Sequence, residues 1–186
     1  MVPRGKEKSG KERILDSHVH LDFIERYRPH RIEWLKEAGC AVVSWAYCEG
    51  ADSVSRLEAC LKSKGNCIKR HAQAGLACHY LAGVHPRSIP PDLEPGQIGP
   101  LLHFSLEDPL CKGIGEIGLE KGDSKEELKR IISMGSDRMD RIMCNTDSGD
   151  RFYEDVVQLS RDNDLPEAAR KKLFYGNGAR FFSLSY

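Results

Sequence analysis

Short apolar runs typical of buried strands alternate along this 186-residue chain with longer stretches of helical periodicity. Strands are expected at 14–22, 41–47, 77–84, 111–119 and 141–147, and helices at 31–38, 52–74, 98–108, 124–135, 153–159 and 166–175. Parallel strands need a long crossover, usually a helix, so this alternation predicts a parallel sheet with helices outside it. We therefore expect an α/β fold whose functional groups lie at the carboxyl ends of the strands.

Composition and charge narrow the class of protein. The chain is 40% hydrophobic with a net charge of +0, which predicts a single globular domain at 13–186 after a flexible basic tail at 1–12. A neutral chain lacks the general basic field of non-specific nucleic-acid binders. We find no apolar run that predicts a signal peptide or a membrane span.

The seven cysteines show no C-x-x-C spacing, which argues against a zinc ribbon and a secreted disulfide framework. We expect a cytoplasmic protein, and we interpret six of the seven as small buried hydrophobic residues: Cys40, Cys48, Cys60, Cys78, Cys111 and Cys144.

The first strand carries two histidines one residue apart. In a regular strand every second side chain shares a face, so we expect Asp16, His18, His20 and Asp22 on one face and Leu15, Ser17, Val19 and Leu21 on the other. Two imidazoles held side by side on a rigid strand suit a divalent metal. The alternative is a pair of partly buried polar residues at a strand end.

Three further polar groups fall where later strands are expected to end. His85 precedes Pro86, which cannot donate to a sheet, while Glu116 lies among small and apolar residues and Asp147 follows the run at 141–146. A buried carboxylate needs a partner, which is either a metal or an arginine. Together with His18 and His20, these residues predict a metal site at one rim of the sheet.

Five motifs, in order along the chain, resemble the TatD family of metal-dependent deoxyribonucleases, within the amidohydrolase-like group. D-S-H-V-H-L-D at 16–22 resembles the family's H-x-H-L-D, A-G-V-H-P at 82–86 its G-x-H-P, and G-I-G-E-I-G-L at 113–119 its I-G-E-I-G-L. N-T-D-S at 145–148 is similar to E-T-D-S, and N-G-A-R-F-F at 177–182 is loosely similar to a motif near the family's end.

The resemblance implies a TIM-barrel-like (β/α)n hydrolase that cleaves phosphodiester bonds of DNA with Mg²⁺, Mn²⁺ or Zn²⁺. His18, His20, Glu116 and Asp147 would bind the metal, Glu116 bridging two ions in the complete family site. Asp147 would also orient the attacking water, and His85 would approach the substrate phosphate. A metal-bound water is a strong nucleophile near neutral pH.

The chain departs from the family between Leu119 and Asn145, where the family places two histidines that hold the second metal. All seven histidines here lie at or before His103, and residues 120–144 have room for one helix and its connections. We therefore expect a barrel truncated relative to the complete eight-stranded one, an internal deletion between 120 and 138, and one metal. A second copy of the chain would be one way to cover the open sheet edges.

Two alternatives to a DNA hydrolase remain at this point. One is a non-catalytic shortened isoform or fragment of such a hydrolase. The other, less favoured by the G-x-H-P and E-I-G-L patterns, is an amidohydrolase that acts on a small amide.

Overall fold

The computed structural model describes residues 13–85, 88–115, 143 and 166–184. Their helices and strands follow one another as β1 Leu15–Val19, α1 Leu21–Tyr27, α2 Pro29–Glu37, β2 Ala41–Trp45, α3 Val54–Gln73, β3 Ala77–Ala82, a 3-10 turn at Pro95–Gln97, α4 Ile98–Leu106, β4 Cys111–Ile114, α7 Glu167–Lys171, a π-helical turn at Lys172–Gly176, and α8 Asn177–Phe181.

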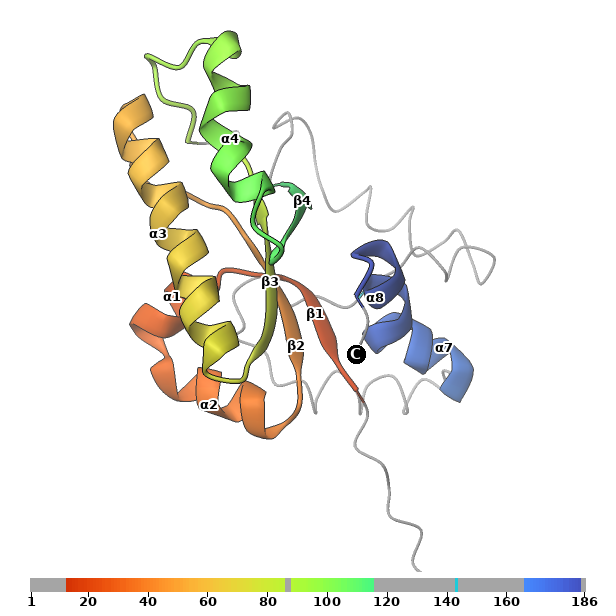
Figure 1. The fold of residues 1–186 in the computed structure, drawn as a ribbon. Helices are drawn as coiled ribbons and strands as arrows, with labels where there is room; N and C mark the ends of the chain where they lie inside the picture. Colours follow the sequence, from red (N-terminus) through yellow and green to blue (C-terminus); the bar gives the residue numbers. More distant parts are fainter. Residues whose placement is uncertain (1–12, 86–87, 116–142, 144–165, 185–186) are drawn as a thin grey trace, which may run out of the picture.

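The described strands form one parallel sheet in the order β1-β2-β3-β4, with helices between successive strands. Helices α1 to α4 lie on one side of the sheet, and α7 and α8 lie on the other side, next to β1 (Figure 1). This arrangement confirms the predicted α/β, TIM-barrel-like class. Four strands are present in the described part, against eight in a complete barrel.

Capping residues and glycines set the ends of these helices. Ser53 caps α3 by accepting a hydrogen bond from the Arg56 backbone N–H, and apolar residues four apart, including Leu57 and Leu61, are buried beneath it. Gly39 and Gly75 follow α2 and α3 with φ of +69° and +90°, a conformation that costs glycine little.

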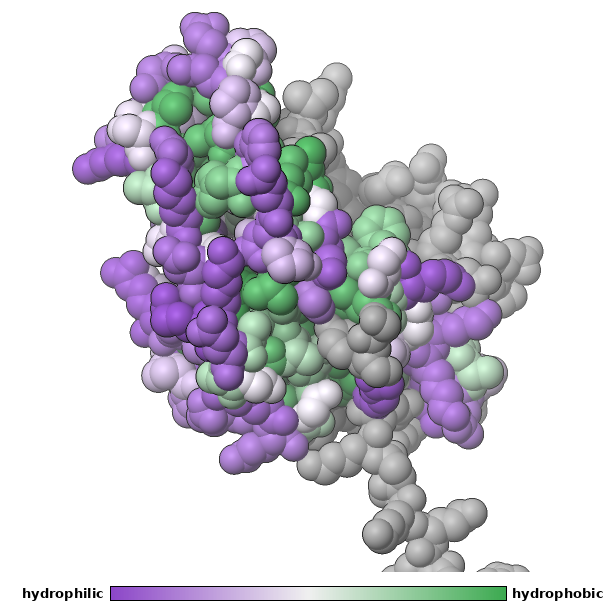
Figure 2. Space-filling model, in the orientation of Figure 1, coloured by the Kyte–Doolittle hydropathy of each residue, from purple (hydrophilic) through white to green (hydrophobic). Residues whose placement is uncertain are grey.

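Two apolar clusters lie on the two faces of the sheet. The one beneath α1 to α4 includes Val19, Val42, Leu57, Leu61 and Tyr80. The other, beneath α8, joins Leu15, Ala41, Val43 and Leu81 of the strands to Ala179 and Phe182. Figure 2 shows hydrophilic side chains over the outer helices and apolar ones gathered toward the middle of the view.

The predicted alternation of β1 is wrong, because the strand contains a bulge. Leu15 pairs with Ala41 and Val19 with Ser44, so β1 has one residue more than β2 over this stretch. Leu15 and Val19 consequently belong to opposite clusters instead of sharing a face. The alternation also ends early, since Asp22 lies in the first turn of α1 and not in the strand.

The interpretation of the cysteines needs one correction. Cys48 and Cys60 are joined by a disulfide with a Cα–Cα distance of 5.9 Å, whereas Cys40, Cys67, Cys78 and Cys111 are not in disulfides. The bridge fastens the loop after β2, where Cys48 is buried, to the second turn of α3, where Cys60 is partly buried.

Several predictions fall outside the described residues: the tail at 1–12, the helices at 124–135 and 153–159, the deletion between 120 and 138, and the strand at 141–147 apart from Met143. None of the helices that the structure describes has the length and hydropathy needed to cross a bilayer.

Candidate metal centre

Histidines from two strands gather at the carboxyl end of the sheet. His18 lies in β1, His20 directly follows it, and His85 follows β3. The ring centres of His18 and His20 are 5.4 Å apart in an edge-on arrangement. Tyr47, which follows β2, lies near histidines from both strands. Its ring centre is 5.9 Å from that of His20 and 4.7 Å from that of His85.

Trp45, the last residue of β2, positions both histidines of the first strand. Its indole stacks on the His18 ring, with centres 4.3 Å apart and planes within 5°. The indole N–H donates to the Ser17 carbonyl at 2.7 Å, which fixes the ring against β1. The sequence predicts Trp45 only as a strand residue, so its role in the site was missed.

The backbone carbonyl of Trp45 also determines which nitrogen of His20 is available. Nδ1 of His20 lies 3.1 Å from that carbonyl oxygen, which can only accept a hydrogen bond. Nδ1 therefore carries the proton, and the lone pair of Nε2 is left for another partner. Metal-binding histidines are commonly oriented in this way by a backbone carbonyl.

A sharp turn from β1 into α1 holds His20 in place. Its carbonyl oxygen accepts from the backbone N–H groups of Phe23 and Ile24 at 3.0 and 3.1 Å. The Leu21 N–H donates to Oγ of Ser44 in β2 at 3.0 Å, so the first residue of α1 is fastened to the neighbouring strand.

Asp22 lies next to this turn and is paired with Lys64 of α3 through Oδ2. Its second oxygen, Oδ1, is buried and has no hydrogen-bond partner among the residues that the structure describes. The carboxylate can therefore accept a further hydrogen bond, for example from a bound water.

The two predicted carboxylate ligands, Glu116 and Asp147, lie outside the described residues. The residue before the first of them, Gly115, donates its N–H to the Ala82 carbonyl at 3.0 Å. A Cβ at Gly115 would lie 3.2 and 3.3 Å from the Trp45 ring. The described chain thus runs up to the indole that stacks on His18.

The remaining histidines are placed elsewhere: His30 in α2, His71 in α3, His79 in β3 and His103 in α4. Burial and then the positive charge of Lys112 lower the pKa of His79, which therefore stays neutral to lower pH. None of these four histidines was predicted to lie at the end of a strand, and the structure places none of them at a described strand end.

A second group of metal-competent side chains lies between two helices. Glu25 of α1, Cys67 and His71 offer one ligand atom each, all within 4.8 Å of one another. Burial, together with the neighbouring Glu25 charge, raises the pKa of the Cys67 thiol to about 12. This group was not predicted, because its members lie 42 and 46 positions apart in the sequence.

Comparison with known proteins identifies a family and a similar solved structure. A TatD-like protein from Archaeoglobus fulgidus is 25% identical with a TM-score of 0.42, over 82% of this chain and 64% of that one. The chain thus spans less than two thirds of that protein. A search of curated proteins gives no match. The family of TatD-related DNases matches residues 15–150, so the chain belongs to this family, whose members are in general metal-dependent hydrolases.

Proposed function

We propose that this chain hydrolyses phosphodiester bonds of DNA with one divalent metal, held by His18, His20, Glu116 and Asp147. His85 approaches the substrate phosphate, and Asp147 orients the attacking water. The observation that carries the proposal is the gathering of His18, His20 and His85 at one end of the sheet, next to Trp45 and Tyr47.

The two imidazoles fit one ion. Metal–nitrogen bonds of about 2.1 Å at roughly tetrahedral or octahedral angles hold ring centres about 4.5 to 5.5 Å apart. The ring centres of His18 and His20 are 5.4 Å apart, and the Trp45 carbonyl leaves Nε2 of His20 free to bind. The donor set of two imidazoles and two carboxylates suits Mn²⁺ or Zn²⁺.

Each neighbouring residue then has a defined task. The metal, when bound, supplies a water of lowered pKa and neutralises charge on the phosphate. Trp45 keeps both histidines in place, and Tyr47 packs edge-on against His85. Gly115, the residue before the proposed ligand Glu116, is packed so closely that a Cβ there would lie 3.2 and 3.3 Å from the Trp45 ring.

The test measures metal content and DNA cleavage with the full chain. We expect one Mn²⁺ per chain by elemental analysis and cleavage of end-labelled DNA that a chelator abolishes. His18→Ala should lose both. His103→Ala is the matched control, since His103 is an exposed histidine of α4 paired only with Glu107 in the described part, and should keep both. His85→Ala should keep the metal and lose cleavage. Cleavage that survives chelation, or metal retained by His18→Ala, would contradict the proposal.

One sequence observation favours a second candidate, a non-catalytic shortened form. Residues 120–144 hold none of the histidines that the family uses for a second metal. Loss of supporting groups commonly costs about 10- to 100-fold in metal affinity or activity. Under this reading the chain binds Mn²⁺ through His18 but cleaves neither DNA nor a small amide.

A further inference from the structure

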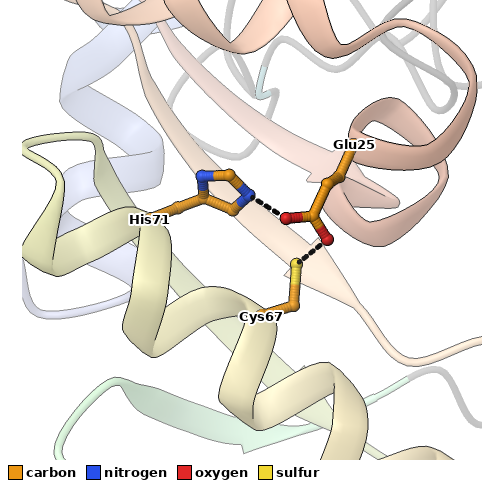
Figure 3. A group of neighbouring side chains, drawn as sticks. All are labelled: Glu25, Cys67 and His71. Atoms are coloured by element: carbon orange, nitrogen blue, oxygen red, sulfur yellow. Dashed lines mark hydrogen bonds and ion pairs between the residues drawn. The ribbon is translucent and has the colours of Figure 1, made fainter.

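Glu25, Cys67 and His71 point toward one another across the contact between α1 and α3 (Figure 3). Cys67 and His71 are four residues apart on α3 and therefore share one face of that helix. Glu25 reaches them from α1, with one carboxylate oxygen for each partner. The group combines a thiol, an imidazole and a carboxylate, which are the three ligand types that bind zinc in proteins.

Two of the separations already approach those of a zinc site, and the three ligand atoms all lie within 4.8 Å of one another. Nε2 of His71 lies 3.0 Å from Oε1 of Glu25, and Sγ of Cys67 lies 3.5 Å from Oε2. In a tetrahedral site with bonds of about 2.0 to 2.3 Å, ligand atoms are about 3.3 to 3.8 Å apart. Small side-chain rotations would therefore admit an ion without moving either helix.

Burial of the group also suits a bound ion. The Cys67 side chain is buried, while the side chains of His71 and Glu25 are 14% and 37% exposed. An ion there would have sulfur on its inner side and solvent on its outer side, where a water can complete the coordination.

Arg70 competes with a cation for this group. Its guanidinium donates to both oxygens of Glu25 at 3.0 and 2.9 Å, although its side chain is 57% exposed. A guanidinium on the surface can move into solvent at little cost, since exposed ion pairs are weak. Arg70 therefore neutralises Glu25 in the metal-free protein and can be displaced.

We propose that Glu25, Cys67 and His71 form a second metal site for a zinc-class cation, which fastens α1 to α3. On binding, Cys67 releases its proton to solvent and becomes a thiolate ligand. The site is separate from the strand-end histidines and does not depend on the proposed hydrolysis. Its preference for a sulfur-binding ion also distinguishes it from an Mn²⁺ site of imidazole and carboxylate.

The test uses Co²⁺ as a spectroscopic probe of the full chain, without added thiols. Thiolate ligation gives a charge-transfer band in the near ultraviolet that imidazole and carboxylate do not give. We expect this band in the wild type and its loss in Cys67→Ser. Cys78→Ser removes another buried thiol, one that donates to the Ile68 carbonyl, and should keep the band.

Two further variants test the other members of the group. His71→Ala should weaken Co²⁺ binding, and Arg70→Ala should tighten it about two- to fivefold, because the competing ion pair is gone. Zn²⁺ should raise the melting temperature of the wild type but not of Cys67→Ser.

His18→Ala separates this proposal from the hydrolase proposal, since it should keep the thiolate band whether or not the chain cleaves DNA. A wild type without the band, or a band that persists in Cys67→Ser, would overturn the proposal. Weaker Co²⁺ binding in Arg70→Ala would show that Arg70 does not compete with the cation for Glu25.

Discussion

Gly115 is the position where one added methyl group tests the packing beside the proposed metal site. In Gly115→Ala the new Cβ would lie 2.9 Å from Cδ1 of Leu81 and 3.2 and 3.3 Å from Cζ3 and Cε3 of Trp45. Carbon atoms prefer separations of about 3.5 to 4.0 Å, so the Leu81 and Trp45 side chains must both shift. The φ of Gly115 lies outside the left-handed region, so the cost is steric alone.

Overpacking of this kind costs about 1 to 3 kcal/mol. For a chain of this size, that corresponds to a decrease in melting temperature of about 2 to 12 °C. Because Trp45 stacks on His18 and accepts from His20, its displacement should also weaken Mn²⁺ binding. Thermal and urea melts followed by circular dichroism measure the first effect, and Mn²⁺ titration the second.

A matched variant and a double-mutant cycle make the argument refutable. Gly65→Ala, inside α3, places its Cβ 3.4 Å from the Tyr80 hydroxyl and should be neutral or stabilising by up to about 1 kcal/mol. Leu81→Val removes the Cδ1 atom that the added methyl group would touch, so Gly115→Ala should cost less in that background. The predicted steric overlap would be refuted if the stability costs of Gly115→Ala and Leu81→Val were strictly additive. It would also be refuted if Gly115→Ala were as stable as Gly65→Ala.

Three other measurements test the fold and its site. Gly178→Ala should lower the melting temperature, because its Cβ would lie 2.6 Å from Cδ2 of Leu15 and push α8 off β1. The pKa of His79 is lower in the folded protein than in the unfolded chain. As pH falls below about 6.5, His79 therefore binds a proton in the unfolded chain before it does so in the folded protein. Urea melts should therefore show stability lost below that pH in the wild type and less in His79→Gln. In Trp34→Phe, which leaves Trp45 as the only indole, Zn²⁺ should change the fluorescence and a chelator should reverse the change.

The elements that the sequence predicts correctly are those whose signals are local. The run at 41–47 becomes β2, the helical spacing at 52–74 becomes α3, and the run at 77–84 becomes β3, each within a few residues. Their boundaries depend on nearby chemistry, such as the Ser53 cap and the left-handed glycines after α2 and α3. The gathering of His18, His20 and His85 follows from the alternation of strands and helices along the chain, since the carboxyl ends of parallel strands meet at one edge of the sheet.

The features that the sequence does not predict depend on contacts between distant residues. The bulge in β1 arises from its register with β2, so a pattern of alternate residues in one strand cannot show it. The Cys48–Cys60 bridge depends on how the loop after β2 meets α3. The stacking of Trp45 on His18 likewise requires β1 and β2 to be paired first.

The position of His20 depends on α1 as much as on β1, because the strand ends at Val19 and His20 caps the helix that begins with Leu21. Two ion pairs from successive turns of α1, Asp22 with Lys64 and Glu25 with Arg70, hold that helix on α3. An exposed pair such as the second contributes about 0.2 to 1 kcal/mol, whereas the first is more buried and better protected from solvent and salt. A cation at Glu25 would replace the weaker of the two pairs with bonds to Cys67 and His71. His20, the proposed metal ligand that follows β1, is therefore held in place partly by residues of α3, more than 40 positions further along the chain.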